Sequence, residues 1–319
     1  MKFLITGASG FVGAALCTEL LMRGHAVRAA VRTQFPCINT LDQVAIGNID
    51  QHTDWSAALQ EVDIVMHLAA RVHMMKDSAA DPLAAFRQVN LLGTENLARQ
   101  AICSGVKRLV FVSSIKVNGE ETKNSRRYTE QDAPEPQDPY GISKWEAEQS
   151  LWRIAKNSGM EVVIVRPPLI YGAKVKGNFL RLIEALHRGI PLPLAGANNA
   201  RSLLYVGNLL DALITCATTP AAAGQTYLLS DGKPVSTAEL VEKIAQALQQ
   251  SSHSFYIPPL LLHATAAMGG FTAQFNRLFG SLQIDDTKLR KELGWIPPYT
   301  LEQGLNITMA WYRQAKGQR

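Results

Sequence analysis

A chain of 319 residues, 47% of them hydrophobic and 18% charged, can bury a large core and lacks the composition of a disordered protein. The net charge of +5 favours an anionic ligand only weakly, and because the basic residues are scattered we expect no nucleic acid partner. The four cysteines (Cys17, Cys37, Cys103 and Cys216) lie far apart, without the spacing of metal ligands or of a disulfide framework, so we expect no metal site.

The hydropathy pattern predicts neither a membrane span nor a signal peptide. No stretch approaches the roughly 20 apolar residues that cross a bilayer. The apolar run at residues 3–5 is too short for the hydrophobic region of a signal peptide. We therefore expect a cytoplasmic location.

The first predicted elements are a buried strand over residues 3–5, a turn with Gly7, Gly10 and Gly13, and a helix that follows. A glycine-rich turn between a strand and a helix N-terminus lets backbone N–H groups approach a pyrophosphate, whose charge the helix dipole favours. The glycine spacing departs from the G-x-G-x-x-G fingerprint, and a plain strand–helix turn is the alternative. The position of the turn favours a dinucleotide site.

The second predicted strand, residues 25–32, ends on Arg32. At this point of a dinucleotide-binding unit, an acidic residue would hold the ribose 2′-hydroxyl, whereas an arginine would accept a 2′-phosphate. No acidic residue lies near Arg32, so the sequence favours NADP over NAD, with a merely solvated arginine as the alternative.

Strand and helix patterns continue to alternate along the chain, which predicts an α/β fold with a Rossmann-type, doubly wound parallel sheet. Beyond residue 166 the alternation loosens. We expect residues 1–166, with about 201–231, to form the dinucleotide-binding domain, and residues 167–200 and 232–319 to form a smaller, interwoven substrate-binding lobe. The expected strands are 44–46, 63–70, 107–112, 161–165 and 226–229, and the expected helices are 55–59, 82–105, a helix that begins at 139, 178–188 and 209–217.

Tyr140 and Lys144 are four residues apart at a predicted helix start, which places them on one helix face. Free tyrosine titrates near pH 10, but a lysine ammonium and a positively charged oxidised nicotinamide beside it would lower that pKa. Ser114, at the end of the strand over residues 107–112, could hold the same substrate oxygen. We predict that these three residues move a proton on a carbinol or carbonyl while the cofactor moves the hydride.

A second Tyr-x-x-x-Lys pair, Tyr312 and Lys316, shows that the spacing also arises by chance. This pair lies in the final residues, after an ordinary amphipathic pattern and without a serine-bearing strand before it. We interpret it as a surface pair.

Six motifs, in family order, resemble an extended short-chain dehydrogenase/reductase of the NAD(P)-dependent sugar epimerase/dehydratase family, which includes the UDP-glucose 4-epimerases. They are residues 6–13, 67–70, 89–94, 113–114, 140–144 and 166–172. The resemblance implies that Tyr140 is catalytic, that Lys144 also binds the nicotinamide ribose and that Ser114 contacts the sugar 4-oxygen. The cofactor-binding residues expected from the turns and the resemblance are Gly7, Ser9, Gly10, Phe11, Val12, Gly13, Arg32, Asn48, Ile49, Leu68, Ala69, Ala70, Tyr140, Lys144 and Pro167.

The resemblance also suggests substrate contacts. Asn178 and Arg201 match residues that hold the diphosphate of a sugar nucleotide, and a helix N-terminus beside an arginine makes a reasonable diphosphate clamp. A salt bridge to Asp211, or a surface role, is the alternative for Arg201. Lys116 and Asn118 stand at the expected rim of the sugar pocket, where the family usually has other residues, and we count Lys116 among the substrate-binding residues.

The cofactor decides between two reactions. An epimerase can keep one bound NAD, whereas a 4-keto reductase consumes NADPH. Arg32 favours reduction of a UDP-linked 4-keto-6-deoxy-hexosamine in surface polysaccharide synthesis, as in the bacterial 4-reductases that the chain resembles. A UDP-glucose or UDP-N-acetylglucosamine 4-epimerase is the first alternative, and a non-catalytic nucleotide-sensing protein on the same fold is the second.

Two further expectations concern surfaces. The family pairs its subunits through the two long helices that correspond to residues 82–103 and 140–156, so a homodimer with a four-helix interface is expected. The apolar segment over residues 255–282 either caps the sugar pocket or presents an apolar face to a membrane-bound partner, and its spacing does not decide between these roles.

Overall fold

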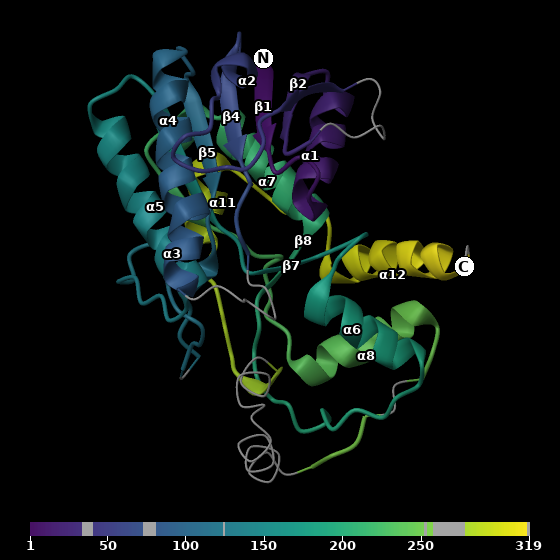
Figure 1. The fold of residues 1–319 in the computed structure, drawn as a ribbon. Coiled ribbons are helices and arrows are strands. Elements are labelled where there is room, and N and C mark those ends of the chain that lie inside the picture. The colour runs from purple at the N-terminus through teal and green to yellow at the C-terminus, as the bar shows by residue number, and fades with distance from the viewer. Residues whose placement is uncertain (34–40, 73–80, 124, 252–253, 258–277, 318–319) are drawn as a thin grey trace.

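The computed structural model describes the chain apart from residues 34–40, 73–80, 124, 252–253, 258–277 and 318–319 (Figure 1). Its centre is a seven-stranded parallel sheet in the order β3-β2-β1-β4-β5-β6-β9. In that order the strands are β3 (Asp42–Ala45), β2 (Ala26–Val31), β1 (Lys2–Thr6), β4 (Ile64–His67), β5 (Arg108–Val112), β6 (Glu161–Arg166) and β9 (Thr226–Leu228).

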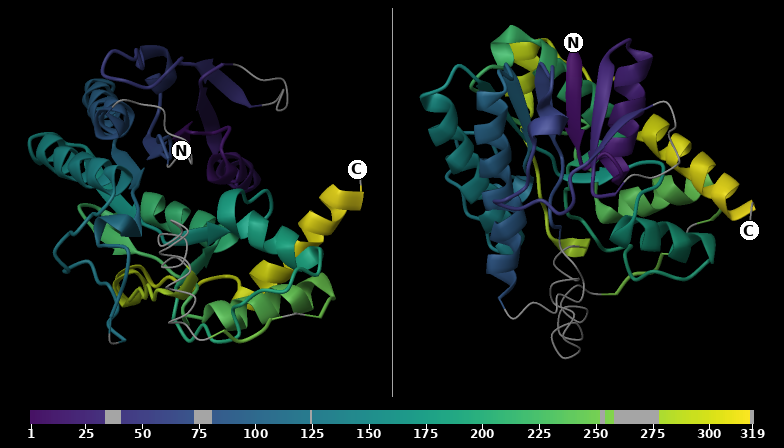
Figure 2. Two further views of the ribbon diagram at one scale, coloured as in Figure 1. Left: turned by 60° about the horizontal axis from the view of Figure 1, so that its bottom comes forward. Right: turned by 45° about the horizontal axis from the view of Figure 1, so that its top comes forward.

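Helices cover both faces of the sheet (Figure 2). On one face α1 (Phe11–Met22) packs against α7 (Val206–Thr218). On the other face α4 (Gly93–Cys103) packs against α5 (Pro139–Lys156) and the short α2 (Ser56–Leu59). This layered arrangement confirms the predicted α/β, doubly wound fold.

Burial on both faces explains why the strands are continuous hydrophobic runs rather than alternating patterns. In β1, Phe3 and Ile5 join the core cluster beneath α1 and α7, and Leu4 joins the cluster beneath α4 and α5. The chain leaves β1 towards β2 on one side and returns to β4 on the other. The carboxyl ends of β1 and β4 therefore flank the point where the strand order reverses, where such sheets bind ligands.

The helix predicted over residues 82–105 is present but not uniform. It consists of α3 (Pro82–Arg87), a π-helical segment η2 (Gln88–Leu92) and α4. In η2 the side chain of Asn90 is buried and bonds to the backbone of Arg71 and to Ser143 rather than facing solvent. A π-turn adds a residue to one helical turn, which re-aims the side chains that follow it.

Most of the remaining elements lie below the carboxyl edge of the sheet, whereas α11 packs against β9 and η4 (Figure 1). Helix α8 packs between α6 and α12, and β7 pairs with β8 in a separate two-stranded sheet. The bounds are β7 (Leu169–Tyr171), α6 (Gly177–His187), β8 (Leu203–Tyr205), the 3₁₀ turn η4 (Pro220–Ala222), α8 (Thr237–Leu248), α11 (Thr287–Leu293) and α12 (Leu301–Gly317).

Tyr312 of α12 is buried, so the interpretation of this residue as a surface tyrosine is wrong. Its ring packs edge-on against His187 of α6, and Lys316 lies 5.9 Å from the centre of the ring. The amphipathic pattern identified the helix, but not the neighbouring helix that covers its apolar face.

The charged, proline-rich segment over residues 120–138 is held against a distant part of the chain. Tyr128 N–H donates to the Gln283 carbonyl at 2.8 Å, and Asp285 N–H donates to the Tyr128 carbonyl at 2.9 Å. Thr122 N–H donates to the Ser281 carbonyl at 2.8 Å. The segment that leads to Tyr140 is therefore docked on residues 281–285.

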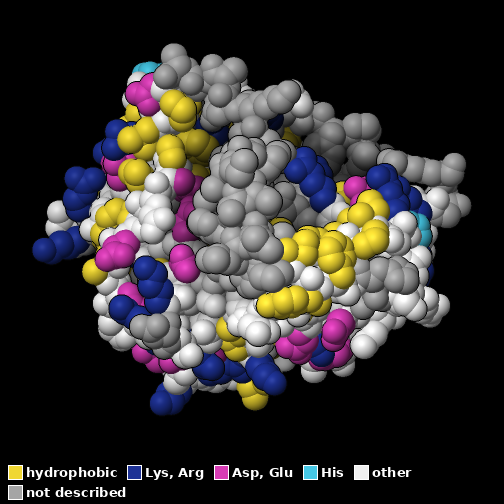
Figure 3. Space-filling view, turned by 90° about the horizontal axis from the view of Figure 1, so that it is seen from below, with side chains coloured by type: hydrophobic (Ala, Val, Ile, Leu, Met, Phe, Trp, Pro, Cys, Tyr) yellow, Lys and Arg dark blue, Asp and Glu magenta, His cyan; other side chains and the backbone are white. Residues whose placement is uncertain are grey.

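Among the described residues, no helix is long and apolar enough to span a bilayer. Figure 3 shows hydrophobic side chains gathered in patches on the face seen from below. Phe255, Tyr256 and Leu278 are among the exposed large hydrophobic residues. Most of the apolar segment discussed above, residues 258–277, lies outside the described residues.

Candidate active site

The glycine turn after β1 is closed by backbone packed directly on backbone. Gly7 has a φ of +69°, and a Cβ on it would lie 2.9 Å from the amide nitrogen of Ala69. A Cβ on Gly13 would lie 2.2 Å from the Gly7 carbonyl oxygen. Both glycines are required by these close approaches, and the predicted cofactor residues after β1 and β4 therefore touch each other.

The first turn of α1 has the features of an anion site. Its N-cap, Gly10, has no side chain to accept a hydrogen bond from the first backbone N–H groups, and no acidic residue stands in the first turn. Ser9 and Gly10 are exposed, and Phe11 and Val12 are half-buried. The first N–H groups of a helix have no acceptor within the helix, so this end fits the diphosphate of a dinucleotide.

A buried chain of hydrogen bonds fixes the end of β4 beside this turn. His67 Nδ1 lies 2.7 Å from Thr6 Oγ1, and His67 Nε2 lies 2.9 Å from Thr94 Oγ1. Burial lowers the pKa of His67 to about 3, so the ring is neutral. Thr94 donates its proton to the Asn90 carbonyl at 2.7 Å and must therefore accept from Nε2–H.

Thr6 then donates to His67 Nδ1, and its oxygen accepts from the backbone N–H groups of Leu68 and Ala69 at 3.1 and 3.0 Å. The side-chain polar atoms of Thr6, His67 and Thr94 therefore all have hydrogen-bond partners. The network holds the half-buried residues Leu68, Ala69 and Ala70 against the glycine turn.

The other predicted cofactor residues follow the neighbouring strands. Arg32 is exposed directly after β2, and β2 itself contains no acidic residue. Asn48 is exposed and Ile49 half-buried after β3. Pro167 is buried after β6, where its carbonyl accepts from Ile115 N–H at 3.0 Å. All of these positions lie at the carboxyl edge of the parallel sheet.

Ser114 and Tyr140 meet at this edge. Ser114 follows β5 and caps the 3₁₀ turn η3 (Ile115–Val117), where its Oγ accepts from Lys116 N–H at 3.2 Å. Tyr140 is the second residue of α5, and its side chain is hydrogen-bonded to that of Ser114. The N-cap of α5 is Asp138, whose carboxylate accepts from Gly141 N–H at 2.7 Å.

The expected lowering of the tyrosine pKa is not produced by the side chains of the chain. Burial and the Asp138 carboxylate raise the pKa of Tyr140 to about 12, and the hydrogen bond to Ser114 opposes them. Burial lowers the pKa of Lys144 to about 7, with Glu148 acting in the other direction. Lys144 is therefore only partly protonated near neutral pH, because desolvation outweighs the attraction to the Glu148 carboxylate.

A buried ion pair fixes the strand ends behind these residues. Arg166 Nε and Nη2 donate to the two oxygens of Glu148 at 3.0 and 2.5 Å, and Ser113 donates to the same carboxylate. Arg166 Nη1 also donates to Asn118 Oδ1 at 3.0 Å. Lys144 Nζ lies 4.0 Å from the centre of the Phe111 ring. These contacts orient α5 relative to β5 and β6.

Two residues expected at the rim of the sugar pocket are engaged elsewhere. Asn118 is buried, and its amide donates to the Thr129 carbonyl at 3.0 Å while accepting from Arg166. The Lys116 ammonium forms ion pairs with Glu120, at 2.7 Å, and with Asp138. The ion pairs of Lys116 were not expected, because Glu120 and Asp138 lie in the loop before α5, whose course the sequence did not reveal.

The predicted diphosphate residues lie in the C-terminal part of the molecule. Asn178 is exposed in the first turn of α6, whose N-cap residue Lys176 makes no side-chain hydrogen bond. Arg201 is half-buried, and its guanidinium donates to the Gly280 carbonyl at 2.8 Å. Asp211, the partner considered for Arg201, pairs with Arg23 at 2.8 Å.

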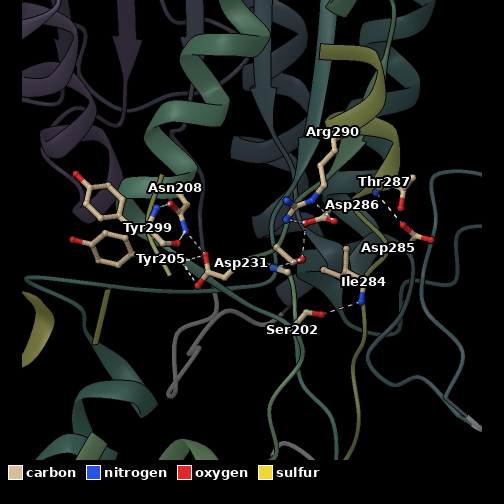
Figure 4. A network of polar contacts seen from close by, with 12 residues as sticks. Ser202, Tyr205, Asn208, Asp231, Ile284, Asp285, Asp286, Thr287, Arg290 and Tyr299 are labelled. Carbon is tan, nitrogen blue, oxygen red and sulfur yellow. Dashed lines mark hydrogen bonds and ion pairs between the residues drawn. The ribbon is translucent and has the colours of Figure 1, made fainter. Parts of the chain in front are cut away.

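A second polar network joins β8, α7 and α11 (Figure 4). The half-buried Asp231 accepts from Tyr205 N–H at 2.9 and 3.0 Å, from Asn208 at 2.7 Å and from the Tyr171 hydroxyl at 3.0 Å. Desolvation raises its pKa. Beside it, Asp286 pairs with Arg290 at 2.8 Å.

The sequence interpretation assigned no role to Thr6, Thr94 or Asp138. Thr6, His67 and Thr94 were part of the motifs, but their hydrogen bonds depend on how β1, β4 and α4 pack. Asp138 could have been found, because Asp followed by Pro is typical of a helix N-cap and first position. Among the described residues, no three His, Cys, Asp or Glu side chains converge to hold a metal ion.

Fold and site together define a Rossmann-type enzyme with a Ser-Tyr-Lys group beside a dinucleotide turn. The model of the NAD dependent epimerase/dehydratase family matches residues 3–230. This chain belongs to that family, as the six motifs predicted, and is an NAD(P)-dependent enzyme of the short-chain dehydrogenase/reductase superfamily.

Three relatives show the range of similarity. UDP-glucose 4-epimerase of Vibrio cholerae is 42% identical over 318 residues, which cover 98% of this chain and 96% of the relative. N-acetyl-alpha-D-glucosaminyl-diphospho-ditrans,octacis-undecaprenol 4-epimerase of Escherichia coli O157:H7 is 27% identical over 97% of this chain and 94% of the relative. The structure of MoeE5 in complex with UDP-glucose and NAD has a TM-score of 0.78 at 25% identity, covering 99% of this chain and 100% of MoeE5.

Proposed function

We propose that this protein is a 4-epimerase of a UDP-hexose, UDP-glucose or UDP-N-acetylglucosamine, with NAD as its cofactor. The observation that carries the proposal is the 42% identity, over almost the whole of both chains, to a UDP-glucose 4-epimerase. The similarity to MoeE5, solved with UDP-glucose and NAD, supports it. This reverses the preference for a reductase that the sequence alone suggested.

In this proposal the chain's own residues handle the proton. Tyr140 accepts the proton of the sugar 4-hydroxyl and later returns one, and Ser114, to which Tyr140 is hydrogen-bonded, holds the same oxygen. Lys144 lies one helical turn from Tyr140 and holds the nicotinamide ribose. A dinucleotide held by these residues would supply the hydride chemistry at C4, accepting the hydride and donating it back to the other face of the sugar.

The glycine turn with Ser9, Phe11 and Val12 would hold the cofactor diphosphate, and Leu68, Ala69, Ala70 and Pro167 would line the path of the dinucleotide. Asn48 and Ile49 would contact adenine. On the substrate side, Asn178 and Arg201 would hold the sugar-nucleotide diphosphate. We assign residues 1–166 and about 201–231 to the cofactor domain, and residues 167–200 and 232–319 to the substrate lobe.

The 4-keto reductase remains a second candidate because of Arg32. An exposed arginine after β2, without an acidic residue beside it, suits the 2′-phosphate of NADPH. A reductase of a UDP-4-keto-6-deoxy-hexosamine would consume that cofactor in each turnover. The two candidates therefore differ in the cofactor that the protein retains.

The first experiment identifies the cofactor released on denaturing the purified protein and assays the protein with UDP-glucose and UDP-N-acetylglucosamine. Stoichiometric NAD and C4 inversion without added reductant would support the epimerase. Exchangeable NADPH and consumption of a UDP-4-keto sugar would support the reductase.

Tyr140→Phe should lower kcat by about 10²- to 10⁴-fold with either substrate class. The matched control is Tyr312→Phe, from the second Tyr-x-x-x-Lys pair, whose buried hydroxyl has no hydrogen-bond partner among the described residues. The control should retain full activity. If the protein binds dinucleotide but Tyr140→Phe changes no activity, the chain is a nucleotide sensor rather than an enzyme.

The proposal also includes a homodimer paired through α3, α4 and α5, as the family resemblance suggests. Light scattering should give twice the chain mass of 34.9 kDa. A mass of one chain would contradict this part of the proposal without affecting the assignment of the reaction.

A further inference from the structure

Lys116 connects the two residues that meet at the reaction site. Its backbone N–H donates to Ser114 Oγ at 3.2 Å. Its ammonium forms an ion pair with Asp138, the N-cap of the helix that carries Tyr140. One residue of the 3₁₀ turn η3 therefore contacts Ser114 through its backbone and the start of α5 through its side chain.

The Asp138 carboxylate both orients Tyr140 and opposes its ionisation. One oxygen accepts from Gly141 N–H at 2.7 Å and so begins α5 in the orientation that presents Tyr140. Its negative charge also lies close enough to Tyr140 to oppose ionisation of the phenol. The ammonium of Lys116, on the other oxygen, offsets this charge.

Among the described residues, few other charged groups pack around Tyr140. On its own helix are Asp138 and Lys144, and Ser114 reaches it from the end of β5. From α3 the uncharged ring of Phe86 packs edge-on with a centroid distance of 6.1 Å, and the Arg71 guanidinium lies 5.6 Å from that ring. Glu120 faces Lys116 rather than Tyr140.

We propose that Lys116 is a positioning residue for the proton transfer, whose ion pair with Asp138 keeps the helix cap in place and screens its charge so that Tyr140 can give up its proton. This inference rests on the proposed function of Tyr140. The residue was expected to contact substrate, and the structure gives its ammonium two carboxylate partners within the protein instead.

The test compares the pH dependence of kcat for Lys116→Met, Lys116→Arg and Asp138→Asn. Loss of the ammonium leaves the Asp138 charge unscreened, so the rising limb of the profile should move to higher pH by about one unit in Lys116→Met. Lys116→Arg should restore the wild-type limb. Asp138→Asn keeps a residue that caps helices well but removes the charge, so the limb should move to lower pH.

The double variant Lys116→Met/Asp138→Asn separates this role from a general structural one. If Lys116 acts through Asp138, the Lys116→Met shift should disappear when residue 138 is asparagine. A shift of equal size in both backgrounds would overturn the proposal. Glu120→Gln, which removes the other carboxylate on the same ammonium, is the matched control and should leave the limb in place.

A measurement without substrate keeps the proposal testable if the assigned reaction is wrong. Tyrosinate absorbance is recorded against pH for each protein saturated with NAD. Subtracting the same titration recorded in the Tyr140→Phe background leaves the ionisation of Tyr140. Lys116→Met should raise that midpoint and Asp138→Asn should lower it. Unchanged midpoints would overturn the role of Lys116, whichever reaction the enzyme catalyses.

Discussion

At the scale of single residues, Lys144 shows how a buried ammonium destabilises the fold. Its side chain is buried, and its ammonium lies over the face of Phe111. The cation–π contact and the Glu148 charge do not offset the loss of hydration, so the pKa is lowered to about 7. The unfolded chain binds this proton more tightly than the folded chain does.

Lys144→Met should abolish activity and stabilise the protein. Between about pH 7 and 10.5 the unfolded state holds more protons at this site, so the wild-type free energy of unfolding rises with pH there. The stability gained by the variant should therefore be about 3 kcal/mol smaller at pH 9 than at pH 6. Urea unfolding at both pH values measures this.

The matched control is Lys243→Met. Lys243 lies at the surface and pairs with Glu302 at 2.7 Å, which raises its pKa. Its loss should give no stabilisation at pH 6. A gain of equal size in both variants would mean that burial of the Lys144 charge is not the cause.

Single residues also show the limits of the sequence. Tyr140, Lys144 and Ser114 were predicted from residue spacing and strand ends, which are local patterns. The side chains of the protein itself raise the pKa of Tyr140, because the residue is buried and lies near Asp138, which only the packed structure reveals. The ion pairs of Lys116 with Glu120 and Asp138 could not be predicted, because the loop that carries these carboxylates has no periodic pattern.

At the scale of elements, the network around Asp231 holds the β8–α7 corner together (Figure 4). Its carboxylate satisfies the backbone of Tyr205 and the side chains of Asn208 and Tyr171. Asn208 in turn accepts from Tyr299 N–H at 2.9 Å, just before α12. One carboxylate therefore links two strands with the start of the last helix.

Asp231→Ala should lower the free energy of unfolding by about 2–4 kcal/mol, because it leaves several buried donors without an acceptor. Urea denaturation followed by circular dichroism measures the change. Asp285→Ala, whose carboxylate accepts from Thr287 N–H at 2.9 Å, should cost about 1 kcal/mol or less. Equal losses would show that the Asp231 network does not hold this corner.

Hydrophobic periodicity predicted the strands of the large sheet, but not β7, β8, α8 or α11, nor the irregularities within helices. The strands were identified because both of their faces are buried, which requires unbroken apolar runs such as residues 3–5. The π-helical segment η2 was missed, because nothing in the spacing of Gln88–Leu92 differs from an α-helix. The segment is instead accompanied by tertiary contacts, the hydrogen bonds of Asn90 to the Arg71 backbone and to Ser143.

At the scale of the whole molecule, His67 makes stability depend on acidity. It is neutral in the folded protein because burial lowers its pKa to about 3 from the ordinary 6.5. Below pH 6.5 the unfolded chain takes up a proton that the folded chain does not, so stability falls as the pH falls towards 3. Between pH 6.5 and 4 this amounts to about 3 kcal/mol.

The slope of unfolding free energy against pH should be shallower in His67→Gln than in the wild type over that range. His52→Gln, a change at an exposed histidine after β3, is the matched control and should keep the wild-type slope. If both variants keep it, groups other than His67 govern acid unfolding.

The overall architecture could be predicted from the sequence, because alternation of strand and helix and a right-handed chain path leave few arrangements for a parallel sheet. The association between the loop over residues 120–138 and residues 281–285 could not. These segments are far apart in the chain and meet through backbone hydrogen bonds, which depend little on side-chain identity.

The glycine turn has a consequence for protein engineering. Gly7 and Gly13 are each closed in by backbone atoms that have no side chain to move aside. Neither glycine of this turn can therefore be replaced by a larger residue without moving the backbone. Arg32 and Thr33, the exposed residues directly after β2, are where a library of variants should be built.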